Sequence, residues 1–308
     1  MPFELFVPMK HVYLICLFCL IFWLSNCGSK NKVNVDDIPP PPEDFIPPPP
    51  VDLGPIPEGT VEGELLSLTL AGQVYRFRWI PPGSFTMGTD TDPDRFLTSE
   101  GVEMESPAHN VTISSGFWML ETEVTQDQWF SQMGTSPSNI KGGTLPVVNI
   151  QYADIVNTKG FFDRLHTQTI RTNKFLLPTE AQWEYAYRAG TTTKFYWGDD
   201  PSGSEIVDNC WNATNSGNTL HAVGQKIGNP WNLLDMSGNA YEIVSDFASF
   251  YTSSTQVDPK GPSSGTIRVY RGGSYKSNAA NCRATNRILD EQLVAHDNQG
   301  FRFIMKPD

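Results

Sequence analysis

A proline-dense stretch from Pro39 to Pro57 constrains the fold of this chain more than any other feature. Ten of its nineteen residues are proline. Because proline fixes φ and has no amide donor, such a run cannot lie inside a helix or a central strand. We interpret residues 28–60 as an extended, polyproline-type tether, which joins a short N-terminal segment to a folded domain over residues 61–308. A partner-binding PxxP site is the alternative interpretation of the same prolines.

The N-terminal segment contains thirteen consecutive apolar or aromatic residues, at positions 12–24. Lys10 and His11 precede this run, and small polar residues follow it. A helix of this length spans about 20 Å, whereas the hydrocarbon core of a bilayer is about 30 Å thick. A basic residue, a short apolar run and then small polar residues predict a secretory signal peptide, with an uncleaved membrane anchor as the alternative.

The end of the apolar run, Leu24-Ser25-Asn26-Cys27, resembles a bacterial lipobox. This resemblance implies that Cys27 is diacylated and becomes the mature N-terminus, so that residues 1–27 form a lipoprotein signal peptide. We therefore expect an exported protein that is lipid-anchored to the bacterial membrane, at the outer membrane or the cell surface.

The distribution of the five cysteines agrees with export. Cys16 and Cys19 would leave with the signal peptide, and Cys27 would carry the lipid. Cys210 and Cys282 remain in the exported domain, where they could pair, stay free and buried, or bind a metal ion. The spacing of these two cysteines does not decide among the three alternatives.

Composition limits the class of protein. The chain has 308 residues, of which 39% are hydrophobic, enough for a sizeable core. Its 25 glycines and 24 prolines favour many turns over a helical bundle. The net charge of −12, without a local basic stripe, argues against nucleic acid as a partner. We expect one monomeric domain.

Local signals predict three helices and several short strands. Capping-box patterns at Thr125–Gln128 and Thr179–Gln182 predict helices that end at Met133 and Arg188. Apolar spacing over residues 151–166 predicts the third helix, with its apolar side chains inward. The predicted strands are Tyr75–Ile80, Val111–Ile113, 267–271 and 300–305. We expect the two ends of the domain to meet in a small sheet.

Nine short motifs occur in a fixed order along the domain. They are Pro82–Gly88, Glu105–Pro107, Glu123–Thr125, Leu145–Val148, Leu177–Glu184, Tyr196–Asp199, Asp235–Glu242, Arg271–Ser274 and Gly300–Arg302. In this order and spacing, from about residue 74 to residue 306, they resemble the formylglycine-generating enzyme family, the sulfatase-modifying factor domain. The resemblance implies an α+β fold of the C-type-lectin-like kind, with little regular secondary structure.

The family resemblance also implies a copper site. Its enzymes oxidise a substrate cysteine with two copper-binding cysteines, which lie three and eight residues after the serine of the Gly-Gly-Ser motif. Counted from Ser274, these positions hold Ser277 and Cys282. A hydroxyl cannot replace a soft thiolate at Cu(I), so we do not expect copper here. Cys282 stays a candidate catalytic residue, with a buried packing role as the alternative, and enzymatic activity is left open.

A calcium site is a second implication of the resemblance. Its ligands would be three backbone carbonyl groups and one carboxylate, from Ser237, Gly238, Ala240 and Glu242. Carbonyl and carboxylate oxygens suit a hard cation. The alternative is a buried ion pair of Glu242 with Arg271 or Arg302.

The segment after Ser274 also resembles the exchangeable region of surface-displayed variable proteins of diversity-generating retroelements. We expect nine of its side chains to project outward and bind a ligand: Tyr275, Lys276, Asn278, Asn286, Leu289, Asp290, Gln292, His296 and Asn298. The framing residues Arg271, Gly272, Gly273, Arg283 and Arg287 are expected to be structural.

These observations leave two functions open. The first is a non-catalytic module that binds an extracellular protein or a small molecule through the segment after Ser274. The alternative is a metal-dependent oxidoreductase of the same family, acting on protein cysteine or a small molecule. An ordinary polar loop face is the third interpretation of the segment itself.

Overall fold

The computed structural model describes residues 50–94, 103–169, 175–200 and 202–308. Cys27, the predicted signal peptide and the first part of the predicted tether lie outside the described residues, so the expectations about them stay predictions. Across those four ranges, no helix has the length and the apolar character needed to cross a membrane.

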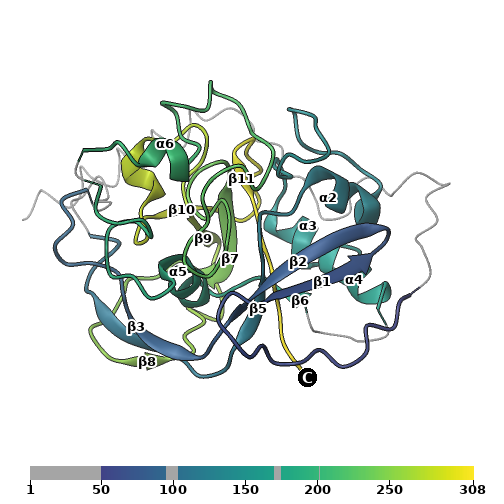
Figure 1. Ribbon diagram of the computed structural model, residues 1–308, viewed down its shortest axis with the longest axis horizontal. Helices are drawn as coiled ribbons and strands as arrows, with labels where there is room; N and C mark the ends of the chain where they lie inside the picture. The colour runs from purple at the N-terminus through teal and green to yellow at the C-terminus, as the bar shows by residue number, and fades with distance from the viewer. Residues whose placement is uncertain (1–49, 95–102, 170–174, 201) are drawn as a thin grey trace, which may run out of the picture. The chain divides into compact units, whose positions relative to one another are not determined.

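Short strands and helices alternate with long ordered loops (Figure 1). The strands are β1 (Leu65–Leu70), β2 (Gln73–Ile80), β3 (Gly83–Met87), β4 (His109–Ile113), β5 (Phe117–Leu120), β6 (Phe175–Leu176), β7 (Tyr241–Phe247), β8 (Gln256–Val257), β9 (Ile267–Arg271), β10 (Arg287–Glu291), β11 (Gln299–Gly300) and β12 (Ile304–Met305). The helical segments are α2 (Gln126–Met133), α3 (Tyr152–Val156), α4 (Phe161–Thr167), α5 (Glu180–Arg188), α6 (Ile206–Asn209) and the 3-10 segment η2 (Ala279–Cys282). This mixture confirms the predicted α+β class.

A five-stranded sheet brings together both ends of the domain. Its strand order is β1-β2-β5-β12-β6, so the hairpin near the start of the domain and β12 near its end belong to one sheet. β5 lies between β2 and β12 and pairs with both in antiparallel register. The prediction that the two ends share a sheet is therefore confirmed.

α2 packs on β2 and α4 packs on β6 of this sheet, and α3 packs on α4. α2 begins at a capping box, in which the Thr125 hydroxyl accepts from the Gln128 amide at 3.2 Å and the Gln128 side chain accepts from the Thr125 amide at 3.0 Å. It ends at Gly134, whose left-handed backbone stops the helix. Trp129 of α2 stacks on Phe161 of α4 with ring centroids 5.5 Å apart, which joins both helices to the main core.

The prediction of a single helix over residues 151–166 is wrong. The structure has two helices there, because the backbone at Gly160 is extended and starts α4 separately from α3. A Cβ atom at Gly160 would lie 2.8 Å from the carbonyl oxygen of Asn157, so the tight connection requires glycine. The side chains predicted to face inward are nevertheless buried: Ile155, Phe162 and Leu165.

α5 links the two smaller sheets, whose strand orders are β10-β9-β7-β11 and β3-β4-β8. It contacts β3, β4, β7 and β9 (Figure 1). The Thr179 hydroxyl caps the helix by accepting from the Gln182 amide at 3.2 Å. Eight of its nine residues are buried, and Trp183, Ala186 and Tyr187 are among the side chains that it adds to an apolar cluster. The predicted helix is thus confirmed.

The strand predicted over residues 300–305 is divided between two sheets. β11 pairs in parallel with β7, whereas β12 pairs with β5 and β6. Between these two short strands, Phe301 and Phe303 enter the main aromatic core. Arg302 points to the other side and donates to Glu242.

The last part of the predicted tether packs on the domain. Ile56 is buried, and its backbone exchanges hydrogen bonds with Asp308: the Asp308 amide donates to the Ile56 carbonyl at 3.0 Å, and the Ile56 amide donates to Oδ2 of Asp308 at 2.6 Å. The Trp118 indole donates to the Pro57 carbonyl at 2.8 Å. Packing therefore begins before residue 61, the start expected from composition.

Four arginines have essentially no solvent exposure, and each one is paired with a buried glutamate. The shortest nitrogen-to-oxygen distances are 2.5 Å for Arg271–Glu184, 2.8 Å for Arg283–Glu105, 2.6 Å for Arg287–Glu180 and 2.7 Å for Arg302–Glu242. Such pairs repay the cost of burying charge only when hydrogen bonds satisfy both groups. These pairs join the C-terminal part of the chain to α5, to β7 and to the loop before β4.

We predict that Arg302→Met lowers the free energy of unfolding by about 3–5 kcal/mol, because Glu242 would stay buried without its partner. The matched control is Arg76→Gln, which removes a half-exposed guanidinium from Glu121 and should cost less than about 1 kcal/mol, because Glu121 keeps its pair with Arg78. Urea denaturation of both variants measures the difference. Equal losses in the two variants would contradict the structural role of Arg302.

Candidate functional site

The segment expected to bind a ligand leaves β9 at Arg271, forms η2 and β10, and returns at β11. Gly272 and Gly273 start it with left-handed backbone, at φ 91° and 80°. A Cβ atom at Gly273 would lie 2.6 Å from Sγ of Cys282, so this position requires glycine for space as well as for conformation.

The Arg271 guanidinium fixes the middle of the segment. It donates to the carbonyl groups of Ala284, Thr285 and Asn286 at 2.7–2.9 Å. Arg283 reaches Glu105 through two nitrogens, at 2.8 and 2.9 Å. The structure therefore agrees with the structural roles expected for these arginines.

The structure divides the nine predicted binding residues by exposure. Lys276 and Asn278 are exposed. Five others are partly exposed: Leu289, Asp290, Gln292, His296 and Asn298. The expectation that Tyr275 and Asn286 project outward is wrong, because they are only 1% and 2% exposed.

Tertiary packing explains both buried positions. Tyr275 packs in a small apolar cluster with Val148, Leu220 and Ala240. Asn286 lies within the stretch that the Arg271 guanidinium binds through backbone carbonyl groups. Neither contact has a signal in the local sequence.

Polar contacts, one of them an ion pair, connect the exposed and partly exposed side chains of the segment. Lys276 Nζ lies 2.7 Å from both carboxylate oxygens of Asp297, and the hydrogen bond to Asp297 raises the pKa of Lys276. Nε2 of His296 lies 2.7 Å from Oδ2 of Asp290. The Asn298 amide donates to the Ser274 hydroxyl at 3.2 Å. The result is a polar surface with charges of both signs on a fixed backbone.

The predicted copper positions differ in character. The hydroxyl of Ser277 is buried and hydrogen-bonds with Tyr241 and Ser274, each at 3.0 Å. Cys282 is fully buried, and its thiol contacts the Asn278 carbonyl at 3.7 Å. Among the described residues, no three His, Cys, Asp or Glu side chains are arranged to hold a metal ion. The structure does not test whether Cys282 is catalytic.

The carboxylate of the predicted calcium set is already occupied. Glu242 accepts from Nε and Nη2 of Arg302, both at 2.7 Å, and from the Trp183 indole at 2.7 Å. This is the buried ion pair given as the alternative, with Arg302 as the partner, since Arg271 pairs with Glu184. Both oxygens of the one carboxylate in the predicted set of Ser237, Gly238, Ala240 and Glu242 therefore already accept hydrogen bonds, and calcium at this set stays a prediction.

Two buried carboxylates near Glu242 were missed by sequence reasoning. Neither oxygen of Glu123 and only one oxygen of Asp235 has a hydrogen-bond partner among the described residues; Oδ2 of Asp235 accepts from the Gly224 amide at 2.5 Å. Burial, with the charge of Asp235 added, raises the pKa of Glu123 well above its usual range. Burial also raises the pKa of Asp235 to about 6. Both residues belong to motifs of the resemblance, but nothing in the sequence signals their proximity.

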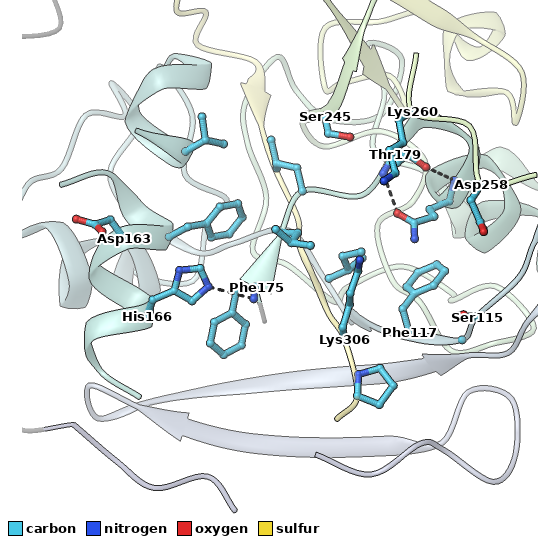
Figure 2. Close-up of a pocket in the computed structure, with 18 of the residues that line it drawn as sticks. Ser115, Phe117, Asp163, His166, Phe175, Thr179, Ser245, Asp258, Lys260 and Lys306 are labelled. Atoms are coloured by element: carbon cyan, nitrogen blue, oxygen red, sulfur yellow. Dashed lines mark hydrogen bonds between the residues drawn. The ribbon is translucent and has the colours of Figure 1, made fainter. Parts of the chain in front are cut away.

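A cavity of about 1010 Å³ lies away from the predicted site, beside α3, α4 and β6. Figure 2 shows His166 and Phe175 on one side, Thr179 and Lys260 on the other, and Lys306 between them. Nε2 of His166 accepts from the Phe175 amide at 3.2 Å, and burial lowers the pKa of His166. None of the nine predicted binding residues lines this cavity. Its lining comes from many separate segments, so the sequence carries no signal for it.

Comparisons with known proteins agree with this architecture. The family model for the sulfatase-modifying factor enzyme 1-like domain matches residues 69–307. The formylglycine-generating enzyme of Streptomyces coelicolor is 37% identical over 141 residues, which are 41% of this chain and 45% of that enzyme. The chain thus spans less than half the length of the first curated relatives it matches.

Two solved structures share the fold over most of the chain. Variable protein 1 of Treponema denticola superposes with a TM-score of 0.68 and 25% identity, covering 79% of this chain and 99% of that one. PvdO of Pseudomonas aeruginosa gives a TM-score of 0.64 and 22% identity, covering 80% and 100%. These likenesses confirm the expected C-type-lectin-like fold. With the motif order and the extent of the family match, they show that this chain belongs to the sulfatase-modifying factor enzyme 1-like domain family.

Proposed function

We propose that this chain is an exported lipoprotein whose domain is a non-catalytic module for binding an extracellular protein or a small molecule. The observation that carries the proposal is the polar surface built on the segment between Lys276 and Asn298. Its side chains combine ammonium, carboxylate, amide and imidazole groups, which suit adaptable recognition.

The architecture of the segment supports this role. Its backbone is held by two fully buried arginines: Arg271 binds its carbonyl groups, and Arg283 pairs with the buried Glu105. Exposed side chains on such a frame can change without loss of core contacts, because the arginines bind backbone carbonyl groups and glutamates. The likeness to variable protein 1 of Treponema denticola, at 25% identity, supports the same interpretation.

The chemistry of the copper positions favours binding over oxidation. Ser277 offers a hydroxyl that is already hydrogen-bonded, and a hydroxyl is a poor ligand for Cu(I). The retained Cys282 is the one feature that favours the alternative, a metal-dependent oxidoreductase acting on protein cysteine or a small molecule. A measurement of bound copper distinguishes the binding function from the oxidoreductase.

The proposed lipid anchor and the tether are consistent with a binding domain that is displayed at the membrane. Lipid on Cys27 would hold the chain at the membrane, and the proline-dense tether would extend at about 3.1 Å per residue. A monomeric domain held at such a distance would be accessible to large partners.

We predict that the triple variant Lys276→Ala, Gln292→Ala, His296→Ala keeps its melting temperature within a few degrees and loses ligand binding. Exposed changes cost under about 0.5 kcal/mol each, because few core contacts are lost. Binding is measured on arrays of extracellular proteins and glycans. The control pair Thr69→Ala, Val74→Ala lies on the exposed side of the β1–β2 hairpin and should bind as the unchanged chain does. A triple variant that unfolds or that binds normally would contradict the proposal.

The purified chain should contain no stoichiometric copper after exposure to Cu(I), because Ser277 offers no thiolate at the first copper position and the Cys210 thiol beside Cys282 is fully buried with a raised pKa. Elemental analysis of the unchanged chain, of Cys282→Ala and of Cys210→Ala measures this. Calcium alone, or no metal, supports the binding function. Copper at one equivalent, lost in Cys282→Ala and kept in Cys210→Ala, would favour the oxidoreductase.

Replacing Cys27 with alanine should release the protein from the membrane fraction or leave it as an unprocessed precursor, because the acylated residue is gone. Cys16→Ala, within the apolar run, is the matched control and should stay anchored. Fractionation and intact mass report the outcome. Unchanged mass and unchanged membrane retention in the Cys27 variant would rule out acylation at this residue.

A further inference from the structure

Two buried cysteines outside the proposed binding surface lie against each other. Cys210 follows α6, and Cys282 ends η2. Both are thiols with no solvent exposure, and they share a small cluster with Phe195 and Ile206. Burial, together with the neighbouring Cys282 thiol, raises the pKa of Cys210 well above its usual range.

Two glycines bring separate backbones to this cluster. A Cβ atom at Gly238 would lie 2.7 Å from Sγ of Cys210, and one at Gly273 would lie 2.6 Å from Sγ of Cys282. The Gly238 amide donates to the carbonyl of Gly272 at 2.8 Å, which joins the two stretches of backbone. Both sulfurs therefore lie at one junction, between the chain after α6 and the start of the binding segment.

We propose that Cys210 and Cys282 form an intramolecular disulfide when the chain folds in the presence of a disulfide oxidant. Each thiol loses its proton, the pair loses two electrons, and one sulfur–sulfur bond forms. A small-molecule or protein disulfide takes up the electrons and protons, breaks its own sulfur–sulfur bond and leaves as two thiols. This inference does not depend on the proposed binding function.

Burial determines when the bond can form. An oxidant cannot reach either sulfur in the folded domain, and a raised thiol pKa leaves little thiolate to attack it. The bond therefore forms during folding, before the cluster closes, and is afterwards shielded from reductants. It closes a loop of about 70 residues, which restricts the unfolded chain and so stabilises the folded one.

The test refolds the full chain, with Cys16, Cys19 and Cys27 changed to serine, in two buffers. One contains oxidised and reduced glutathione, and the other contains dithiothreitol. Free thiols are alkylated in denaturant, and tryptic peptides are mapped without reduction. We expect a linked peptide pair that holds Cys210 and Cys282 in the first buffer only, with a melting temperature several degrees above that of the reduced protein.

Matched single variants isolate the bond from packing. In Cys210→Ala and in Cys282→Ala, the difference in melting temperature between the two buffers should disappear. If either variant fails to fold, the proposal is still tested by the protein that keeps both Cys210 and Cys282, through its peptide maps and melting temperatures in the two buffers. Alkylated thiols at both positions after oxidative refolding would overturn the proposal. A linked pair that lowers the melting temperature would also overturn it, because the bond would then be incompatible with the native packing.

Discussion

Four buried arginine–glutamate ion pairs are the interaction on which the arrangement of the loops in this domain depends. Most of the described residues lie in loops, where the carbonyl groups have no helix or strand ladder to bind them. A guanidinium offers five donors in a fixed plane and can serve several carbonyl groups at once. Arg271 does this for three consecutive carbonyls while it pairs with Glu184. The arginines thus add to the backbone–backbone hydrogen bonds that the loops make among themselves.

The same pairs connect parts of the chain that are far apart in sequence. Arg283 reaches Glu105 in the loop before β4, and Arg302 reaches Glu242 at the start of β7. Because burying each charge is costly without its partner, the pairs favour one arrangement of the loops over all others. The buried pairs also fix the backbone of the binding segment, and so hold its polar surface in one conformation.

The elements that could be predicted from the sequence are those whose signals lie within a few consecutive residues. The helices after Thr125 and Thr179 were predicted correctly, because a capping box is complete within four residues. The break at Gly160 was not predicted, although the contacts that require glycine there are local, with the carbonyl groups of Asp154 and Asn157. The burial of Tyr275 and Asn286 was not predicted either, because it depends on contacts with other segments. The nine motifs identified the family, because together and in order they extend over nearly the whole domain.

The site itself was predicted only in part, for a related reason. The sequence shows which side chains are polar, but only the fold decides which of them face solvent. Glu123 and Asp235 illustrate this limit: both lie in recognised motifs, and only the structure reveals two carboxylates in one buried region.

The hydrogen bonds between Ile56 and Asp308 have a mechanical consequence. Together with the bond from the Trp118 indole to Pro57, they fasten the segment that enters the domain to the end of the chain and to the central strand β5. A pull along the entering segment would load these few bonds first. These bonds would break before the force reached the aromatic core or the arginine pairs. When a bound partner pulls on the domain, the entering segment would therefore detach first, and the polar surface of the binding segment would stay folded.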